Sequence, residues 1–283
     1  MAVSAARIAT RRFSNSAFVA FCYFVTAIAL VFLAAVLWTL ILKGVAGMSP
    51  DIFTMDTPPA GSRGGLRNAV VGSAMLCALA MAIALVVGIL AGTWLAEYAG
   101  DSRYGSAVRF INDILLSAPS ILIGLFIWYL LVANVFHHFT GYAGSVALAL
   151  IAVPVIARTT EDVLRLQPTS LRESGVALGT PFWTVIRTIL WRASTGGILT
   201  GALLAFSRIS GETAPLLFTA LNNQYLSSMN EQVANLPVVM FNDALSAYDD
   251  LQRLAWAAAL IVSTAVLGVI IVARILTREQ RSS

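Results

Sequence analysis

The chain has 283 residues, of which 58% are hydrophobic and 11% are charged, with a mean hydropathy of +0.82 and a formal net charge of +4. Soluble domains carry about 25% charged residues, so this composition excludes an ordinary soluble protein and indicates a polytopic membrane protein. The positive charge does not indicate nucleic-acid binding, because the basic residues lie in short segments between apolar stretches and form no basic stripe interleaved with aromatic residues.

Six segments approach or exceed the roughly 20 apolar residues that a membrane-spanning helix needs. They are residues 18–42, 69–95, 112–134, 143–157, 194–220 and 254–276, of which the fourth is the shortest. The first is longer than the core of a signal peptide, so we expect it to remain as an anchor. No low-complexity or Gly/Ser-rich linker divides the chain. We therefore expect one all-α membrane domain of six transmembrane helices over residues 1–283.

The basic residues between these segments are distributed unequally. If the N-terminus is cytoplasmic, thirteen arginines fall on the inner side, and only Lys43, Arg63, Arg67 and Arg253 fall on the outer side. An excess of Lys and Arg is typical of cytoplasmic loops, so both termini are predicted to be cytoplasmic.

Two outer segments are longer than a tight turn requires, residues 44–68 and 222–252. Apolar residues at near-helical spacing in the second segment are compatible with an amphipathic helix along the membrane surface. A loop that only tethers two spans would satisfy the same pattern.

Arg208 and Glu212 lie one helical turn apart within the otherwise apolar fifth segment. An ionised side chain in hydrocarbon costs roughly 2.5–3.5 kcal/mol on insertion scales, so both must face protein or a water-filled path. They can pair along one helix face and only neutralise each other. Alternatively they line a solute path, in which the planar guanidinium of Arg208 binds an oxyanion bidentately and Glu212 orients it or weakens binding enough for release.

Other residues of the spans bear on the same path. Gly211 and Pro215 flank Glu212 and can free backbone groups from the helix, either to face a cavity or as a packing kink. Asp113, near the start of the third segment, is a further candidate for the path and could equally be an interfacial residue.

The longest inner loop, residues 158–192, contains a short predicted helix. Ser170 and Glu173 have the spacing of a capping box, which begins a helix. Gly179 and the proline two residues later end it after about two turns. This predicts a docking helix over residues 170–179, although an ordinary loop helix has the same signals. Small side chains on it permit close approach by another protein: Ser174, Gly175 and Ala177.

The same helix resembles the EAA loop of ABC importer permeases, whose pattern is Glu-Ala-Ala, three residues and Gly. Glu173, Ser174, Gly175 and Gly179 occupy these positions, with Ser and Gly in place of the two alanines, and the second half of the family motif is absent. Longer stretches resemble the PstA-type permeases of bacterial phosphate-specific transport systems: residues 110–120, 178–181, 208–220 and 234–237.

That resemblance implies a type I importer-like permease fold in the bacterial cytoplasmic (inner) membrane, forming half of a phosphate path that works by alternating access. It implies a second, PstC-like permease, a dimer of PstB-like ATPase subunits, an extracytoplasmic PstS-like phosphate-binding protein and surrounding membrane lipid as partners. A functional arginine of the family maps onto Arg208. The ATPase-coupling role maps onto Ser170, Glu173, Ser174, Gly175, Ala177 and Gly179.

The chain has no Gly-x-x-x-x-Gly-Lys-Ser/Thr sequence, so it cannot cradle nucleotide phosphates in a P-loop. We therefore expect a non-catalytic subunit with no cofactor or metal of its own, whose partner ATPase binds ATP and Mg. Arg208 alone does not separate phosphate from sulfate or molybdate. An ion-coupled secondary carrier would need inverted repeats with paired broken helices, and no internal repeat is evident. An intramembrane enzyme is disfavoured because the spans hold no Ser/His pair, paired Asp or metal-binding cluster.

Overall fold

The computed structural model describes the backbone of residues 5–279 and, except for residues 5–10, 13 and 276–279, their side chains. This part of the chain is helical and contains no strand. Its elements are α1 (Ala5–Gly47), α2 (Asp51–Thr54), α3 (Arg67–Glu97), α4 (Arg103–Ser117), α5 (Ser120–Ile127), the π-helix η1 (Trp128–Phe136), α6 (Gly141–Arg165), α7 (Thr169–Ala177), α8 (Phe182–Val185), the π-helix η2 (Ile186–Leu190), α9 (Trp191–Ile209), α10 (Ala214–Thr219), α11 (Leu236–Ala244) and α12 (Asp249–Glu279).

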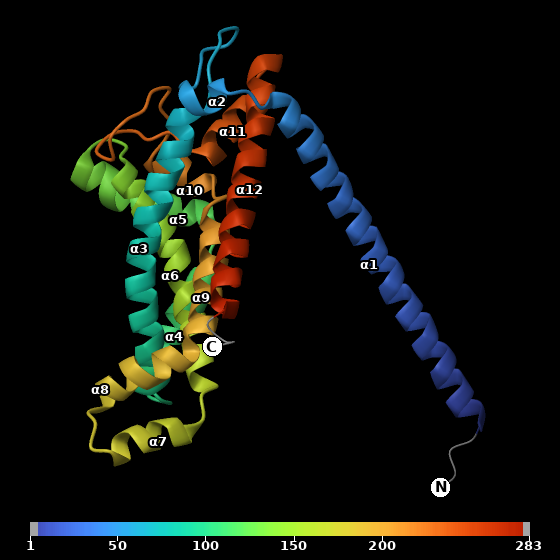
Figure 1. The fold of residues 1–283 in the computed structure, drawn as a ribbon, viewed down its shortest axis with the longest axis vertical. Helices are drawn as coiled ribbons and strands as arrows, with labels where there is room; N and C mark the ends of the chain where they lie inside the picture. Colours follow the sequence, from blue (N-terminus) through green and yellow to red (C-terminus); the bar gives the residue numbers. More distant parts are fainter. Residues whose placement is uncertain (1–4, 280–283) are drawn as a thin grey trace.

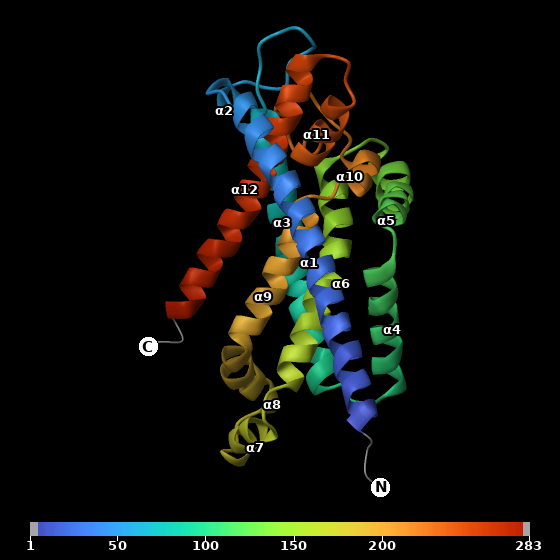
Figure 2. The same ribbon diagram turned by 90° about the vertical axis from the view of Figure 1, so that its right-hand side faces the viewer.

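The bundle is built around α3, α6 and α9, with α12 along one side and α4 and α5 along the other (Figures 1 and 2). The short helices α7 and α8 lie at one end, here called the α7 end, and α2, α10 and α11 lie toward the other, here called the α11 end. Helix α1 leans away from the bundle and meets α12 near the α11 end. Close approach there depends on Gly47, where an added Cβ would be 2.5 Å from the carbonyl oxygen of Arg253.

Within the described part of the chain, five helical segments are long and apolar enough to cross a membrane: Ser14–Gly47, Arg67–Glu97, Gly141–Arg165, Phe182–Ile209 and Asp249–Ile275. The segments Arg103–Ser117 and Ser120–Phe136 meet at 106° and provide a sixth span if the bent pair is counted as one. The all-α, polytopic membrane architecture predicted from composition is therefore confirmed.

The third predicted span, residues 112–134, is not one continuous helix. Helix α4 begins at Arg103, where the Ser102 hydroxyl accepts a hydrogen bond from the Gly105 amide at 3.1 Å, and it ends at Ser117. Ala118 is extended (φ −65°, ψ 135°) because the following proline disfavours a helical conformation in the residue before it. The chain then turns sharply into α5. Pro119 thus divides a segment whose apolar composition predicted a straight span.

The fourth and fifth predicted spans also have different ends. Helix α6 continues from residue 157 to Arg165, because residues 158–165, four of which are charged, keep a helical pattern before Pro168. The fifth was predicted as one helix over residues 194–220, but α9 ends at Ile209 and a separate helix, α10, begins at Ala214.

The predicted capping box of the docking helix is wrong. Helix α7 begins at Thr169, one residue before Ser170, and its N-cap position is Pro168, which makes no side-chain capping bond. Pro168 fixes the start of the helix, so Ser170 lies inside the first turn, where its carbonyl accepts a hydrogen bond from the Ser174 hydroxyl at 2.7 Å. Gly179 has a φ of +75°, the left-handed conformation expected after a helix end.

The predicted surface helix within residues 222–252 lies inside the fold instead. Helix α11 is N-capped by the Asn235 side chain, whose Oδ1 accepts from the Val238 amide at 3.0 Å. Leu236 and Val239 are buried in a cluster with residues of α3 and α12, so this face of α11 packs into the bundle.

Gly72 provides a test of the packing of α3. An added Cβ there would overlap the carbonyl oxygen of Ala234, whereas Gly268 on α12 has no atom within 4 Å of an added Cβ. We expect Gly72→Ala to lower the stability of the detergent-solubilised chain by about 1–3 kcal/mol, because backbone cannot move aside cheaply. The matched Gly268→Ala should be neutral or slightly stabilising. Equal melting temperatures for the two variants would contradict this packing.

Asp243 on α11 gives a pH-dependent prediction. Its side chain is buried, and its Oδ2 has no hydrogen-bond partner within the described residues. Burial, together with the charge of Asp250, raises the pKa of Asp243 to about 6. The folded chain therefore binds this proton more tightly than the unfolded chain, so stability falls as pH rises from about 4 to about 6 and stays lower above that range.

The corresponding expectation is that Asp243→Asn stabilises the chain near neutral pH, by at most about 3 kcal/mol, and removes this part of the pH dependence. Thermal unfolding in detergent at about pH 4.5 and about pH 7.5 measures both effects. If Asp243→Asn changed the melting temperature by the same amount at both pH values, titration of Asp243 would be ruled out as the cause of the stabilisation.

Candidate functional site

The site begins where α9 stops, one residue after Arg208. The amides of Ser210, Gly211 and Glu212 still bond back to carbonyls three or four residues earlier, at 3.0–3.4 Å. Gly211 has no atom within 4 Å of an added Cβ, so no packed side chain fills the space beside it. The helix restarts at Ala214 with Pro215 in its first turn. The helix is therefore interrupted between Ile209 and Ala214, close to the position that Gly211 and Pro215 indicated.

Arg208 and Glu212 are brought together, although loosely. Arg208 Nε lies 3.9 Å from Glu212 Oε1, which is an ion pair beyond hydrogen-bond distance. Within residues 5–279 the Arg208 guanidinium makes no hydrogen bond, and 37% of its side chain is exposed against 18% for Glu212. A guanidinium offers five N–H donors in a planar fork. Among the described residues, none of these donors has a hydrogen-bond acceptor.

The two broken helices meet beside this site. Helix α10 packs against α5, and an added Cβ on Gly124 of α5 would be 2.6 Å from the Cα of Pro215 on α10. Each of these short helices directly follows a helix break, the first at Pro119 and the second at residues 210–213. Breaks at membrane depth are tolerated where the backbone is buried in protein or lines a wet cavity, and discontinuous helices commonly form solute sites.

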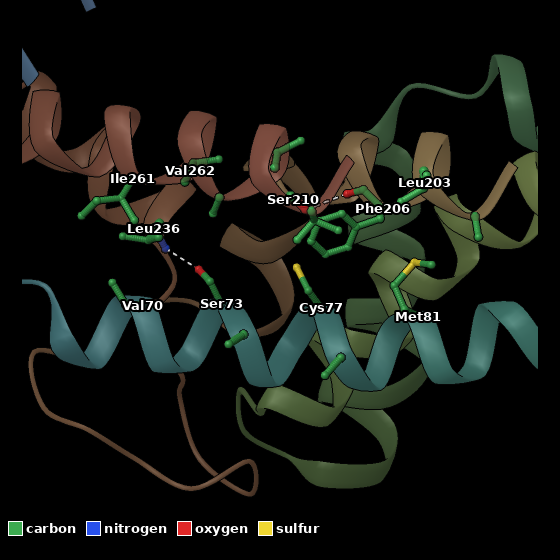
Figure 3. Close-up of a pocket in the computed structure, with 16 residues that line it drawn as sticks. Val70, Ser73, Cys77, Met81, Leu203, Phe206, Ser210, Leu236, Ile261 and Val262 are labelled. Atoms are coloured by element: carbon green, nitrogen blue, oxygen red, sulfur yellow. Dashed lines mark hydrogen bonds between the residues drawn. The ribbon is translucent and has the colours of Figure 1, made fainter. Parts of the chain in front are cut away.

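A cavity of about 510 Å³ lies between α3, α9 and α12, next to the same break (Figure 3). Its main polar groups are already paired: Ser73 Oγ accepts from the Leu236 amide at 2.8 Å, and Ser210 Oγ donates to the Phe206 carbonyl at 2.7 Å. The remaining lining is largely apolar. An oxyanion would lose its hydration there without new partners, so this cavity does not serve as the anion site.

Asp113 lies in a separate cluster. It is the eleventh residue of α4 rather than the start of a span, and its Oδ1 is 3.8 Å from Arg158 Nη1 on α6. Arg158 also pairs with Asp162, at 3.4 Å. All three side chains are about half exposed, so the cluster forms a polar stripe between α4 and α6. Asp113 thus has a cationic partner other than Arg208.

The residues predicted to couple to an ATPase lie on and beside α7, at the opposite end of the bundle from α10 (Figure 1). Five of them are exposed: Ser170, Glu173, Ser174, Ala177 and Gly179. Gly175 is buried instead, and an added Cβ would be 2.7 Å from Val185 Cγ2 on α8. Its small size therefore serves the packing of α7 on its own chain and not approach by a partner.

Sequence reasoning missed a set of buried ion pairs at the α7 end. Glu97 pairs with Arg172, and Glu161 pairs with both Arg109 and Arg165, at 2.6–2.9 Å. The arginines had been assigned to loops by their charge alone. The signal for one pair was present in the sequence, because Glu161 and Arg165 have the i, i+4 spacing of a helix that continues beyond the apolar span.

Comparison with known proteins identifies the arrangement. Residues 88–282 match the family described as binding-protein-dependent transport system inner membrane component. The chain belongs to this family. Among its relatives, the phosphate transport system permease protein PstA of Haemophilus influenzae is 48% identical over 272 residues, 96% of each chain. The protein of the same name from Xylella fastidiosa is 52% identical over 239 residues, 84% of this chain and 83% of the relative.

The fold of this permease is shared with a solved transporter. The structure titled inward facing conformations of the MetNI methionine ABC transporter matches with a TM-score of 0.66, covering 82% of this chain and 99% of that chain. At 18% sequence identity the match concerns the fold only. Both the resemblance to PstA-type permeases and the importer-permease fold expected from the sequence are confirmed by these matches.

Proposed function

We propose that this chain is the permease subunit of an ATP-driven phosphate importer and forms half of its translocation path. The observation that carries the proposal is Arg208, a guanidinium without hydrogen bonds inside the described part of the bundle, at a break between two helices. A planar fork of donors fits the oxygens of phosphate, and a loose carboxylate partner limits the affinity so that the anion can leave. The name printed for the PstA relatives supports phosphate as the solute.

The partners follow from what the chain lacks and what it exposes. It has no P-loop, so ATP and Mg are bound by a PstB-like ATPase dimer. The α7 end exposes large apolar side chains outside the apolar spans, including Leu166 at 80% and Leu178 at 84%, which supports docking of a protein there. A PstC-like permease supplies the other half of the path. Much of the apolar surface of α1 is available to it and to membrane lipid.

The orientation follows from charge. The sequence has thirteen arginines in the segments predicted for one side of the membrane, among them those of α7, and four basic residues on the other side. This supports a cytoplasmic α7 end, with both termini on that side of the inner membrane. The α11 end then faces the extracytoplasmic PstS-like phosphate-binding protein. Rocking of the two permeases would expose Arg208 to each side in turn.

The test is reconstitution of the permease pair, the ATPase and the phosphate-binding protein in liposomes, with radiolabelled phosphate as the transported solute. We expect uptake that requires ATP and all components, and co-purification of the ATPase and the second permease with this chain. Uptake of sulfate or molybdate with their own binding proteins, and none of phosphate, would reassign the solute. Uptake by this chain without any ATPase would instead indicate a secondary carrier.

A further inference from the structure

Helix α7 is fastened to α3 by a buried, bidentate ion pair. Arg172 Nη2 donates to Glu97 Oε1 at 2.6 Å, and Arg172 Nε donates to Glu97 Oε2 at 2.8 Å. The Glu97 side chain is 2% exposed and that of Arg172 is 20% exposed. Hydrogen bonding to Glu97 raises the pKa of Arg172, so the arginine stays charged. Neither residue belongs to the exposed set on α7 that faces a partner.

The same guanidinium also holds the end of α6. Arg172 Nη1 donates to the Gln167 carbonyl and Nη2 donates to the Leu164 carbonyl, both at 2.8 Å. The Leu164 carbonyl lies in the last turn of α6, and the Gln167 carbonyl lies two residues beyond the end of this helix. One side chain of α7 is therefore joined to the ends of both α3 and α6.

A second buried carboxylate ties the neighbouring helices together. Glu161 on α6 is 3% exposed, accepts a hydrogen bond from Arg109 Nε at 2.7 Å and forms an ion pair with Arg165 Nη2 at 2.9 Å. Arg109 on α4 also donates, through Nη2, to the carbonyls of Leu95 and Gly100 beside the end of α3, both at 3.0 Å. The ends of α3, α4 and α6 thus form one joint, to which Arg172 adds α7.

This joint is continuous with the Arg208 site. Helices α3 and α6 pack along much of their length, and Gly92 of α3 contacts α6 so closely that an added Cβ would overlap the Ala157 carbonyl. Further along, Gly144 of α6 faces α10, where an added Cβ would be 2.9 Å from Ala220 Cβ. Helix α6 therefore reaches from the end that Arg172 holds to the helix that follows the Arg208 break.

We propose that the Arg172 to Glu97 pair is the link through which movement of α7 is transmitted to α3 and α6, which makes Arg172 a positioning residue for transport. This rests on the proposed importer function. A buried charge pair in which four of the five guanidinium N–H groups are hydrogen-bonded favours one arrangement, because any displacement of α7 alone would leave the Glu97 carboxylate buried without its partner. The ATPase at α7 therefore moves the ends of α3 and α6 together with α7.

The test measures how efficiently ATP hydrolysis drives phosphate transport, and not only whether the subunits bind one another. In the reconstituted four-component complex, phosphate transported per ATP hydrolysed is compared for Arg172→Gln, Arg172→Lys and Arg103→Gln. Arg103 is the matched control, an exposed arginine at the same end with no ion pair in the described part of the chain. We expect Arg172→Gln to keep ATP hydrolysis but to lower the ratio about tenfold, with Arg172→Lys intermediate because it keeps the charge and loses the fork.

An unchanged ratio in Arg172→Gln, with the wild-type complex transporting normally, overturns the link but leaves the proposed function standing. Absence of phosphate uptake by the wild-type complex defeats the proposed function instead. If the Arg172→Gln complex does not assemble, a second measurement still tests the link. For this measurement Arg172 is retained, Cys22 and Cys77 are replaced, and spin labels are attached at Val176 on α7 and Val87 on α3. The mean separation of the two labels should be the same with and without ATP. A changed separation overturns the link.

Discussion

Replacement of Arg208 by alanine is expected to lower phosphate uptake at least about 100-fold while the four-component complex still assembles, because a charged anion partner is removed without disturbing a packed contact. Among the residues that the structure describes, Arg208 has one ionic neighbour, at 3.9 Å, so few described interactions depend on it. Arg208→Lys should retain a minor part of the activity, since it keeps the charge and loses the bidentate geometry. Initial rates of radiolabelled phosphate uptake in proteoliposomes measure each effect.

The control for Arg208→Ala is Arg192→Ala, which removes an exposed arginine near the α7 end of the same helix. Uptake by that variant should stay near the wild-type rate. The double variant Arg208→Leu with Glu212→Leu separates the two explanations of the pair. If the charges only neutralise each other for insertion, two leucines restore uptake. If Arg208 binds the anion, the double variant is as inactive as Arg208→Ala. Single variants cannot separate these two explanations, because each leaves the other charge without its partner.

The lengths of the straight spans were predictable because burial in lipid demands continuous apolar residues. The segment predicted over residues 69–95 lies within α3, Arg67–Glu97, with a difference of two residues at each end. The predicted fourth span ended too early because it was defined by apolar residues and therefore stopped at the first charged residue. A helix continues for as long as its backbone hydrogen bonds do. Four of the eight residues 158–165 are charged, and the segment is still helical.

The helix breaks were predictable only in part. Pro119 carries a direct backbone signal, since the residue before a proline leaves the helical region, but the apolar composition on both sides hid it. Gly211 and Pro215 were noted as possible openings beside Glu212, and α9 does end there. What no local pattern indicated is that α5 and α10 pack against each other, because that contact joins residues far apart in the chain.

The buried ion pairs were the least accessible part of the site. Glu97 and Arg172 are 75 residues apart, and each is unremarkable among its neighbours at the end of a span or in a polar loop. Charge counting assigns such arginines to one side of the membrane, but it does not distinguish a solvated arginine from one that joins three helices. The exposed residues of α7 show the same limit, since Gly175 could be separated from Ser174 only by its burial.

Replacement of Glu173 by lysine is expected to release the ATPase or to reduce its stimulation by phosphate and the binding protein at least about tenfold, since like charge across a docking surface costs several kcal/mol. Glu173 is exposed on α7, and nothing in the described part of the chain forms an ion pair with it. The fold of the permease itself should therefore be unaffected. Co-purification of the ATPase with the permease pair, followed by ATPase assays at low and high salt, measures the effect.

Asp101→Lys is the matched control, because Asp101 is an exposed acidic residue at the same end, in the turn between α3 and α4 and outside α7. Both substitutions change the net charge equally, so a general electrostatic effect on assembly would appear in both. Loss of the ATPase from the Glu173→Lys complex alone would place the contact on α7. A Glu173→Lys complex that stays intact and transports normally would remove Glu173 from the coupling surface and leave the exposed Leu166 and Leu178 as the part of the α7 end to test next.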